Sequence, residues 1–280
     1  MYTFWVAYPE TFIINPGINK EGENLAKDFS AFYSGAWRML HNPSKVYIGR
    51  TIIEGEPPIF PQPEAFKYLP SFLLLVAPLL ALDYQQALIA FDLVQLALLP
   101  LMAFMLYKLI GKKGLIVAFA LEVIALLLPF PMENWGASVS YYWQWVEGQA
   151  KVLLTFLLIF SFYLGYTRRH YLSGVVFAFG FFDPRFGLLA LPLFVAYNRR
   201  NLLASIPTML ITLFVSNSML LFTGMGSSFI NMVQASAVAT PLYYYSLIPF
   251  LTMSAMNIVN ARELVEVFAP PNSPLALKRS

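Results

Sequence analysis

Long apolar runs follow one another from residue 68 to residue 259. About seven can be distinguished, at residues 68–82, 87–110, 114–131, 150–166, 171–197, 202–222 and 241–259. A helix needs about 20 apolar residues to cross roughly 30 Å of hydrocarbon, so several of these runs are long enough to span a bilayer. The first run is short and contains Pro78. The pattern predicts an all-α membrane protein, a polytopic helical bundle in which some segments are short or re-entrant.

The chain before these runs has a different period. Within residues 28–40, apolar side chains recur at the spacing of an amphipathic helix, at Phe29, Phe32, Tyr33, Ala36, Trp37 and Leu40. Such a helix lies along a membrane surface or on other helices. The Pro-rich residues 42–63 predict an extended, partly ordered segment. We therefore divide the chain into an N-terminal loop with the amphipathic helix (1–67), a transmembrane helical domain (68–259) and a surface tail (260–280).

The fifth run is interrupted by Asp183, Pro184 and Arg185. Basic clusters flank this run, with the sequence TRRH at residues 167–170 and NRR at residues 198–200. The positive-inside rule assigns both clusters to the cytoplasmic side, and only a hairpin of two short helices allows that arrangement. In such a hairpin, Asp183 and Arg185 lie at the opposite, non-cytoplasmic mouth.

The same rule orients the neighbouring segments. The GKKG sequence at residues 111–114 is expected inside, and the polar loop at residues 132–149 is expected outside. The first apolar run leaves two alternatives open. If residues 68–82 cross the membrane, Asp28 falls on the inside, whereas a re-entrant or interfacial segment leaves Asp28 in the outer loop.

The amino-acid composition also indicates that part of this chain is surrounded by lipid. Hydrophobic residues make up 58% of its 280 residues and charged residues only 12%, with a mean hydropathy of +0.62. The net charge of +3 lies largely in short loops, which favours a role in orientation over nucleic-acid binding. The absence of Cys excludes a disulfide and a thiolate nucleophile, and two distant His residues make a zinc site untenable. No Gly-rich phosphate loop, HExxH or GxSxG motif occurs.

Charged residues inside apolar runs are candidates for function because they are costly there. Asp92 and Glu122 either form hydrogen bonds between helices or lie near an interface, or they line a proton or ion path in a small transporter. At the break in the fifth run, Pro184 leaves backbone groups unpaired, which membrane proteins tolerate where protein or an aqueous cavity covers them. Arg185 there can bind a lipid-borne phosphate with two parallel hydrogen bonds, or it can pair with Asp183 or a lipid headgroup.

Two further stretches contain polar groups near aromatic side chains. Asp28 opens the amphipathic helix, where an acidic residue either caps the helix or acts in catalysis. The outer loop and the start of the next run add Glu133, Glu147, Gln149 and Lys151, beside an aromatic cluster of Tyr141, Tyr142, Trp143 and Trp145. Aromatic faces beside carboxylates suit a sugar ring, and an interfacial aromatic belt explains the same cluster.

Several of these strings, in this order, resemble the GT-C membrane glycosyltransferases, especially the polyprenol-phosphate-mannose-dependent α-mannosyltransferases. The strings KDFSAFYSGAWRML, NPSKVYIG and FKYLPSFLLLVAPLLAL are similar to the first outer loop of that family, with Asp28, Tyr47, Tyr68 and Pro70 at its motif positions. EGQAKVLLTFLL resembles its GQ segment, and the region around the DPR break resembles its helical hairpin. The resemblance covers residues 28–200.

The resemblance implies a function and a set of site residues. It implies transfer of a sugar, expected to be mannose, from a polyprenyl-phosphate-linked donor to a glycan or glycolipid acceptor at the non-cytoplasmic face of the cell membrane. Asp28 would be the general base in the first outer loop, with residues 68–82 re-entrant. The expected substrate-binding residues are Lys67, Tyr68, Glu133, Glu147, Gln149, Lys151, Asp183 and Arg185. No metal or other cofactor is expected, because phosphate is already a good leaving group and no DxD pair is present.

Two departures from the family pattern keep another alternative open. The family has a span before the acidic loop, so the chain is expected either to be truncated at its start or to be a reduced relative. Where the family often has Lys-Pro, this chain has Asp183, Pro184 and Arg185. A non-catalytic GT-C-like membrane subunit is therefore the alternative to an enzyme.

Overall fold

The computed structural model describes residues 27–49, 51, 53–59, 65–127, 148–236 and 247–261. Within these ranges the chain is helical and forms no strand, which confirms the predicted all-α class. The helices are α3 (Lys27–His41), η1 (Pro43–Lys45), α4 (Ser71–Val76), η2 (Ala77–Ala81), α5 (Tyr84–Leu127), α7 (Lys151–Tyr166), α8 (His170–Gly180), α9 (Pro184–Asn198), α10 (Leu202–Asn217), α11 (Met219–Phe222), α12 (Met225–Ser236) and α13 (Leu247–Val259).

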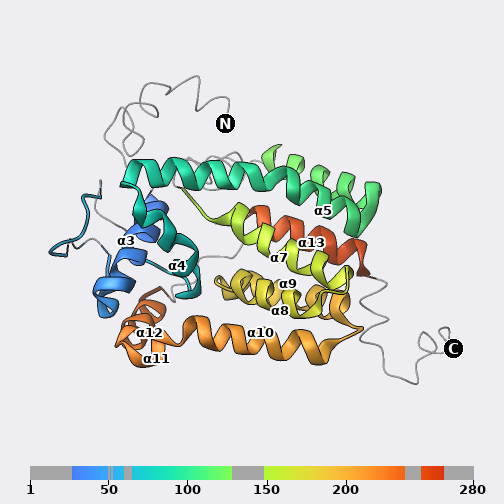
Figure 1. The fold of residues 1–280 in the computed structure, drawn as a ribbon. Helices are drawn as coiled ribbons and strands as arrows, with labels where there is room; N and C mark the ends of the chain where they lie inside the picture. Colours follow the sequence, from blue (N-terminus) through green and yellow to red (C-terminus); the bar gives the residue numbers. More distant parts are fainter. Residues whose placement is uncertain are drawn as a thin grey trace.

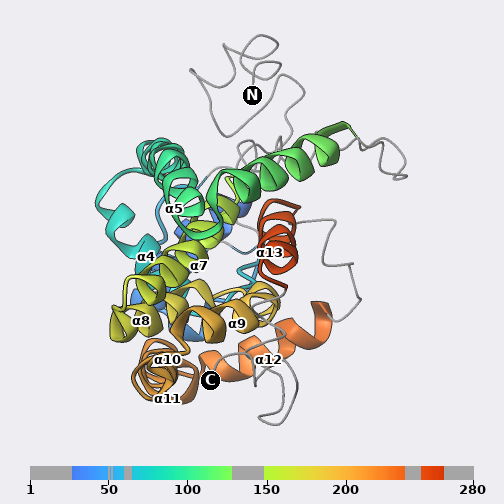
Figure 2. The ribbon, with the colours of Figure 1, turned by 90° about the vertical axis from the view of Figure 1, so that its right-hand side faces the viewer.

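The helices form an elongated bundle (Figure 1). Helices α5, α7, α8, α9 and α10 run side by side, and Figure 2 shows α13 beside α7 and α5. Helices α3, α4, α11 and α12 gather at one end, which we call the α3 end. Helices α5, α7 and α9 begin at the α3 end, whereas α8 and α10 finish there.

Two helices in the described part of the chain are long and apolar enough to cross a membrane, Tyr84–Lys112 and Leu202–Phe222. Helix α5 is broken at Gly111, where a φ of 66° interrupts the helical backbone, so the run predicted at residues 87–110 and the described part of the run at 114–131 are separate helices. The apolar helices Ser71–Ala81, Lys151–Tyr166 and His170–Gly180 are shorter. The number of seven hydrophobic segments therefore stays a prediction.

The predicted hairpin in the fifth run is confirmed. Helix α8 ends at Gly180 and α9 begins at Pro184, a residue that suits the first turn of a helix because its missing N–H is not needed there. The Asp183 side chain caps α9 by accepting a hydrogen bond from the backbone N–H of Arg185 at 3.3 Å. The two basic clusters consequently lie at the same end of the hairpin, opposite the α3 end.

A buried polar network closes that opposite end. The ring nitrogen Nδ1 of His170 lies 3.0 Å from Oδ1 of Asn198. Asn198 Nδ2 donates to Ser173 Oγ at 2.8 Å, and Ser173 Oγ donates to the carbonyl oxygen of Ser161 at 2.8 Å. The network joins the end of α9 to the start of α8 and to α7, and it explains how three apolar helices hold a fixed register.

Residues 68–82 contain one short apolar helix, Ser71–Ala81, in which η2 continues α4. The ring of Tyr68 lies 5.8 Å from that of Phe32, and the Tyr33 hydroxyl donates to the carbonyl oxygen of Leu82 at 2.7 Å. Both ends of the segment therefore contact adjacent residues of α3, whereas a crossing would separate them by about 30 Å. These contacts and the short length of the helix favour the re-entrant or interfacial alternative over a crossing.

Candidate active site

Helix α3 holds the first candidate residue at the α3 end. It buries Phe29, Phe32, Tyr33 and Ala36 as predicted, although Leu40, expected on the same face, is exposed. The Phe32 and Phe72 rings pack edge to face with centroids 4.8 Å apart, which fixes α3 against α4. Asp28 lies in the first turn of α3, so its position follows from this aromatic packing.

Lys151 and Tyr68 meet at the junction of α7 with the loop before α4. Lys151 is the first residue of α7 and only 5% exposed, and its Nζ donates to the Tyr68 hydroxyl at 2.9 Å. The same Nζ lies 5.2 Å from the centre of the Tyr68 ring, a cation–π contact. Tyr47 and Phe182 hold Tyr68 in place: the Tyr47 hydroxyl donates to its carbonyl oxygen at 3.0 Å, and the Phe182 ring packs edge to face at 5.4 Å.

Asp183 connects the two cations of the site. Its Oδ1 accepts from Arg185 Nε at 2.8 Å and its Oδ2 accepts from Arg185 Nη2 at 2.7 Å, while Lys151 Nζ lies 4.0 Å from Oδ2. Asp183 is 1% exposed, whereas the Arg185 side chain is 45% exposed. Arg185 thus pairs with Asp183, one of the alternatives predicted from sequence, and still presents part of its guanidinium to the surroundings.

The charge of the Asp28 carboxylate affects the pKa of Tyr68 in the same cluster. Desolvation raises the pKa of the Tyr68 phenol above its ordinary value, the Lys151 ammonium opposes this change, and the charges of Asp28 and Asp183 add to it. The phenol therefore stays protonated at neutral pH and can donate a hydrogen bond while it accepts one from Lys151. The structure brings together Asp28, Tyr68, Lys151, Asp183 and Arg185.

The remaining predicted site residues lie elsewhere or outside the described residues. Gln149 is buried directly before α7. It follows Gly148, whose φ of 65° suits glycine and where an added Cβ would come within 2.6 Å of Phe29 Cβ. Lys67 is exposed beside Tyr68. Glu133 and Glu147 fall outside the described residues, as does the aromatic cluster at residues 141–145.

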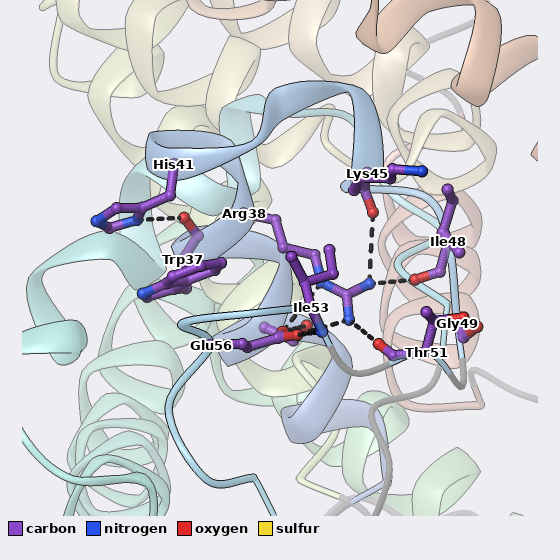
Figure 3. Close-up of polar contacts among 10 residues, drawn as sticks. Trp37, Arg38, His41, Lys45, Ile48, Gly49, Thr51, Ile53 and Glu56 are labelled. Carbon is purple, nitrogen blue, oxygen red and sulfur yellow. Dashed lines mark hydrogen bonds and ion pairs between the residues drawn. The ribbon is translucent and has the colours of Figure 1, made fainter.

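An ion pair that sequence analysis missed orders the Pro-rich segment (Figure 3). Arg38, 1% exposed, reaches Glu56 through Nε to Oε1 and through Nη2 to Oε2, each at 3.0 Å. The Arg38 guanidinium also donates to backbone carbonyls of Lys45, Ile48 and Thr51, and Ser34 Oγ donates to Glu56. No periodicity connects Arg38 with Glu56, so only the folded loop reveals the pair.

The fold and the charged cluster together define a class of protein. An all-helical bundle with two helices able to span a bilayer and a charged cluster at one end is typical of a helical membrane protein whose polar site lies near the membrane surface.

The model of glycosyltransferase family 87 matches residues 66–262, which is more than half of the chain. The protein belongs to this family and is a membrane glycosyltransferase of the GT-C type. The matched range contains Tyr68, Lys151, Asp183 and Arg185, whereas Asp28 lies before it. Comparisons with curated proteins and with solved structures gave no match.

Proposed function

We propose that the protein transfers a sugar, mannose in the first instance, from a polyprenyl-phosphate-linked donor to a glycan or glycolipid acceptor. The observation that carries this proposal is the cluster at the α3 end, where Tyr68, Lys151 and Arg185 surround Asp183. A membrane glycosyltransferase needs a site for an anionic leaving group beside a base; the cations of this cluster supply the first, and Asp28 at the same end supplies the second.

The donor phosphate would bind at the exposed part of Arg185. Two of the five guanidinium N–H groups of Arg185 donate to Asp183 in the described contacts. The guanidinium can therefore contact Asp183 and phosphate oxygens together. Lys151 and the Tyr68 hydroxyl would add a positive charge and a hydrogen-bond donor. Lys67, exposed at the same end, would attract the charged headgroup from the membrane surface.

The reaction would be a single displacement with inversion. The acceptor hydroxyl oxygen forms a bond to the anomeric carbon, the bond from that carbon to the phosphate oxygen breaks, and the phosphate leaves with the electron pair. Asp28 takes the proton of the acceptor hydroxyl. Arg185 and Lys151 stabilise the charge that develops on the phosphate. Gln149 together with Glu133 and Glu147 would contact sugar hydroxyls.

The distribution of basic residues indicates on which side of the membrane the active site would lie. The basic residues at 167–170 and 198–200 lie at the end of the α8–α9 hairpin opposite the α3 end. The positive-inside rule assigns that basic end to the cytoplasm, so the active site would face the non-cytoplasmic side of the cell membrane.

The experiment compares wild type with Asp28→Asn, both purified in lipid and supplied with radiolabelled polyprenyl-phosphate mannose and native membrane lipids as acceptor. Loss of a general base is expected to reduce transfer by roughly 100-fold or more. The matched control is Asp83→Asn, because Asp83 is another acidic residue at the α3 end, exposed where Asp28 is half-buried, and an Asn retains its capping bond to Gln86 N–H. Unchanged transfer by Asp28→Asn would show that Asp28 is not the base.

A further inference from the structure

A buried carboxyl group in α5 has no role in the mechanism described so far. Asp92 is 8% exposed, and its Oδ1 has no hydrogen-bond partner within the described part of the chain. A buried polar atom without a partner lowers stability, and an acidic residue within an apolar helix adds to that cost. Packing therefore does not explain why an acid occupies this position.

Neighbouring residues on α5 show what Asp92 faces. One turn before it, Leu88 Cδ1 lies 3.3 Å from where a Cβ on Gly148 would be. One turn after it, Gln95 Oε1 accepts a hydrogen bond from the backbone N–H of Leu153 at 3.4 Å. Residues three and four apart share a helix face, so Asp92 faces the stretch 148–153, which contains Lys151.

The same turn of α5 also contacts the start of α3. The Phe91 and Phe29 rings lie 5.1 Å apart, and Phe29 directly follows Asp28. Asp92 therefore lies where three helices meet, between the turn that carries Asp28 and the turn that carries Lys151.

We propose that Asp92 is a specificity-determining residue that accepts a hydrogen bond from a hydroxyl of the transferred sugar. This inference rests on the proposed function, in which the sugar ring lies between the phosphate at Lys151 and Arg185 and the base Asp28. Carboxylate oxygens are strong acceptors for hydroxyl groups, and a buried acceptor that only the correct substrate satisfies discriminates well against ligands without that hydroxyl.

Sugar binding at Asp92 requires a local movement. The Oδ1 atom is fully covered, and the turn at residues 148–150 packs over this face of α5. A small shift of that turn exposes Oδ1, and a sugar hydroxyl then supplies the partner that the carboxyl group lacks. Donor binding would thus shift the turn that leads into Lys151.

The test measures binding of two ligands to purified protein in lipid nanodiscs. One ligand is a short-chain prenyl phosphate that carries mannose, and the other is the same prenyl phosphate without sugar. Wild type is expected to bind the mannose form more tightly. Asp92→Leu is expected to lose roughly tenfold to a hundredfold in affinity for the mannose form and to keep its affinity for the sugar-free form.

Thermal unfolding without ligand separates this role from a structural one. Asp92→Leu is expected to be at least as stable as wild type, since it removes an unsatisfied buried group. Asp92→Ala also removes both acceptor oxygens and is expected to change sugar preference in the same direction; it decides the question if the Leu variant does not fold. Ser71→Ala is the matched control, because Ser71 Oγ is another buried atom without a partner in the described contacts, and its loss leaves sugar preference unchanged.

Two results would overturn the inference. Equal affinity of wild type for both ligands means that the site does not read the sugar, and an unaltered preference in both Asp92 variants means that another residue reads it. The transfer assay separates this failure from failure of the proposed function. If wild type transfers mannose, Asp28→Asn abolishes transfer and the Asp92 variants keep the sugar preference, only the role of Asp92 is refuted. If wild type neither binds nor transfers mannose, both proposals are refuted.

Discussion

At the scale of single residues, Asp183 is the centre of the charged cluster. It caps α9, receives two hydrogen bonds from the Arg185 side chain and lies within ion-pair distance of Lys151. Sequence analysis placed Asp183 among the substrate-binding residues. Its contacts favour a different role, in which Asp183 holds two cations close together so that they can face one phosphate, because an uncompensated pair of like charges would repel.

Replacement of Asp183 tests this role. Asp183→Asn is expected to lower the free energy of unfolding by about 3–5 kcal/mol, because it removes the buried carboxylate charge that Lys151 and Arg185 share. Thermal unfolding measures the loss, and the KM for the donor is expected to rise because Arg185 is no longer held. Full stability and an unchanged donor KM in the Asn variant would show that the carboxylate is dispensable.

At the scale of elements, the helices with a regular apolar pattern were predictable, and the contacts of the segment between α3 and α4 were not. The period of α3, the separation of two runs at Gly111 and the α8–α9 hairpin follow from apolar spacing, a helix breaker and flanking charge. The contact of Lys151 with Tyr68 joins residues far apart in sequence, and the Arg38–Glu56 pair lies partly in a segment without periodicity. Such contacts depend on tertiary packing, which a single sequence does not encode in any local pattern.

The Arg38–Glu56 pair is expected to stabilise the whole segment between α3 and α4. Arg38→Met leaves the buried Glu56 carboxylate unpaired and is expected to cost about 3–5 kcal/mol. The double variant Arg38→Met/Glu56→Leu removes the unpaired charge and is expected to recover part of that loss, but not all, because carbonyls that Arg38 serves stay without a donor. Thermal melts of the single and double variants make the comparison; a double variant as unstable as the single one would contradict it.

At the scale of the whole molecule, the two ends of the bundle differ in chemistry. The α3 end carries the charged cluster and the short helix at residues 71–81, and the opposite end carries the basic turns and the His170–Asn198 contact. A site at one end of a membrane-embedded bundle can take a lipid-linked donor from the bilayer and an acceptor from the adjoining compartment.

The absence of native Cys makes this orientation directly measurable. Lys67→Cys and Gln85→Cys flank residues 68–82 at exposed positions, so both are expected to react with a membrane-impermeant maleimide from outside the cell. Thr167→Cys and Asn201→Cys, exposed at the other end, are expected to react only after permeabilisation. These four substitutions leave the basic clusters in place. Opposite sidedness of Lys67→Cys and Gln85→Cys would mean that residues 68–82 cross the membrane.

The ion pair between Lys151 and Asp183 has a consequence for biogenesis. Asp183 follows Lys151 by 32 residues, so a ribosome that adds about 5–20 residues per second delivers the counterion roughly 2–6 s after the lysine. During that interval the ammonium can remain in water at the α3 end of α7, because a lone charge in the hydrocarbon is costly. The ion pair between Lys151 and Asp183 therefore forms only after α7 and α8 have been synthesised, and a chain that stalls before Asp183 lacks it.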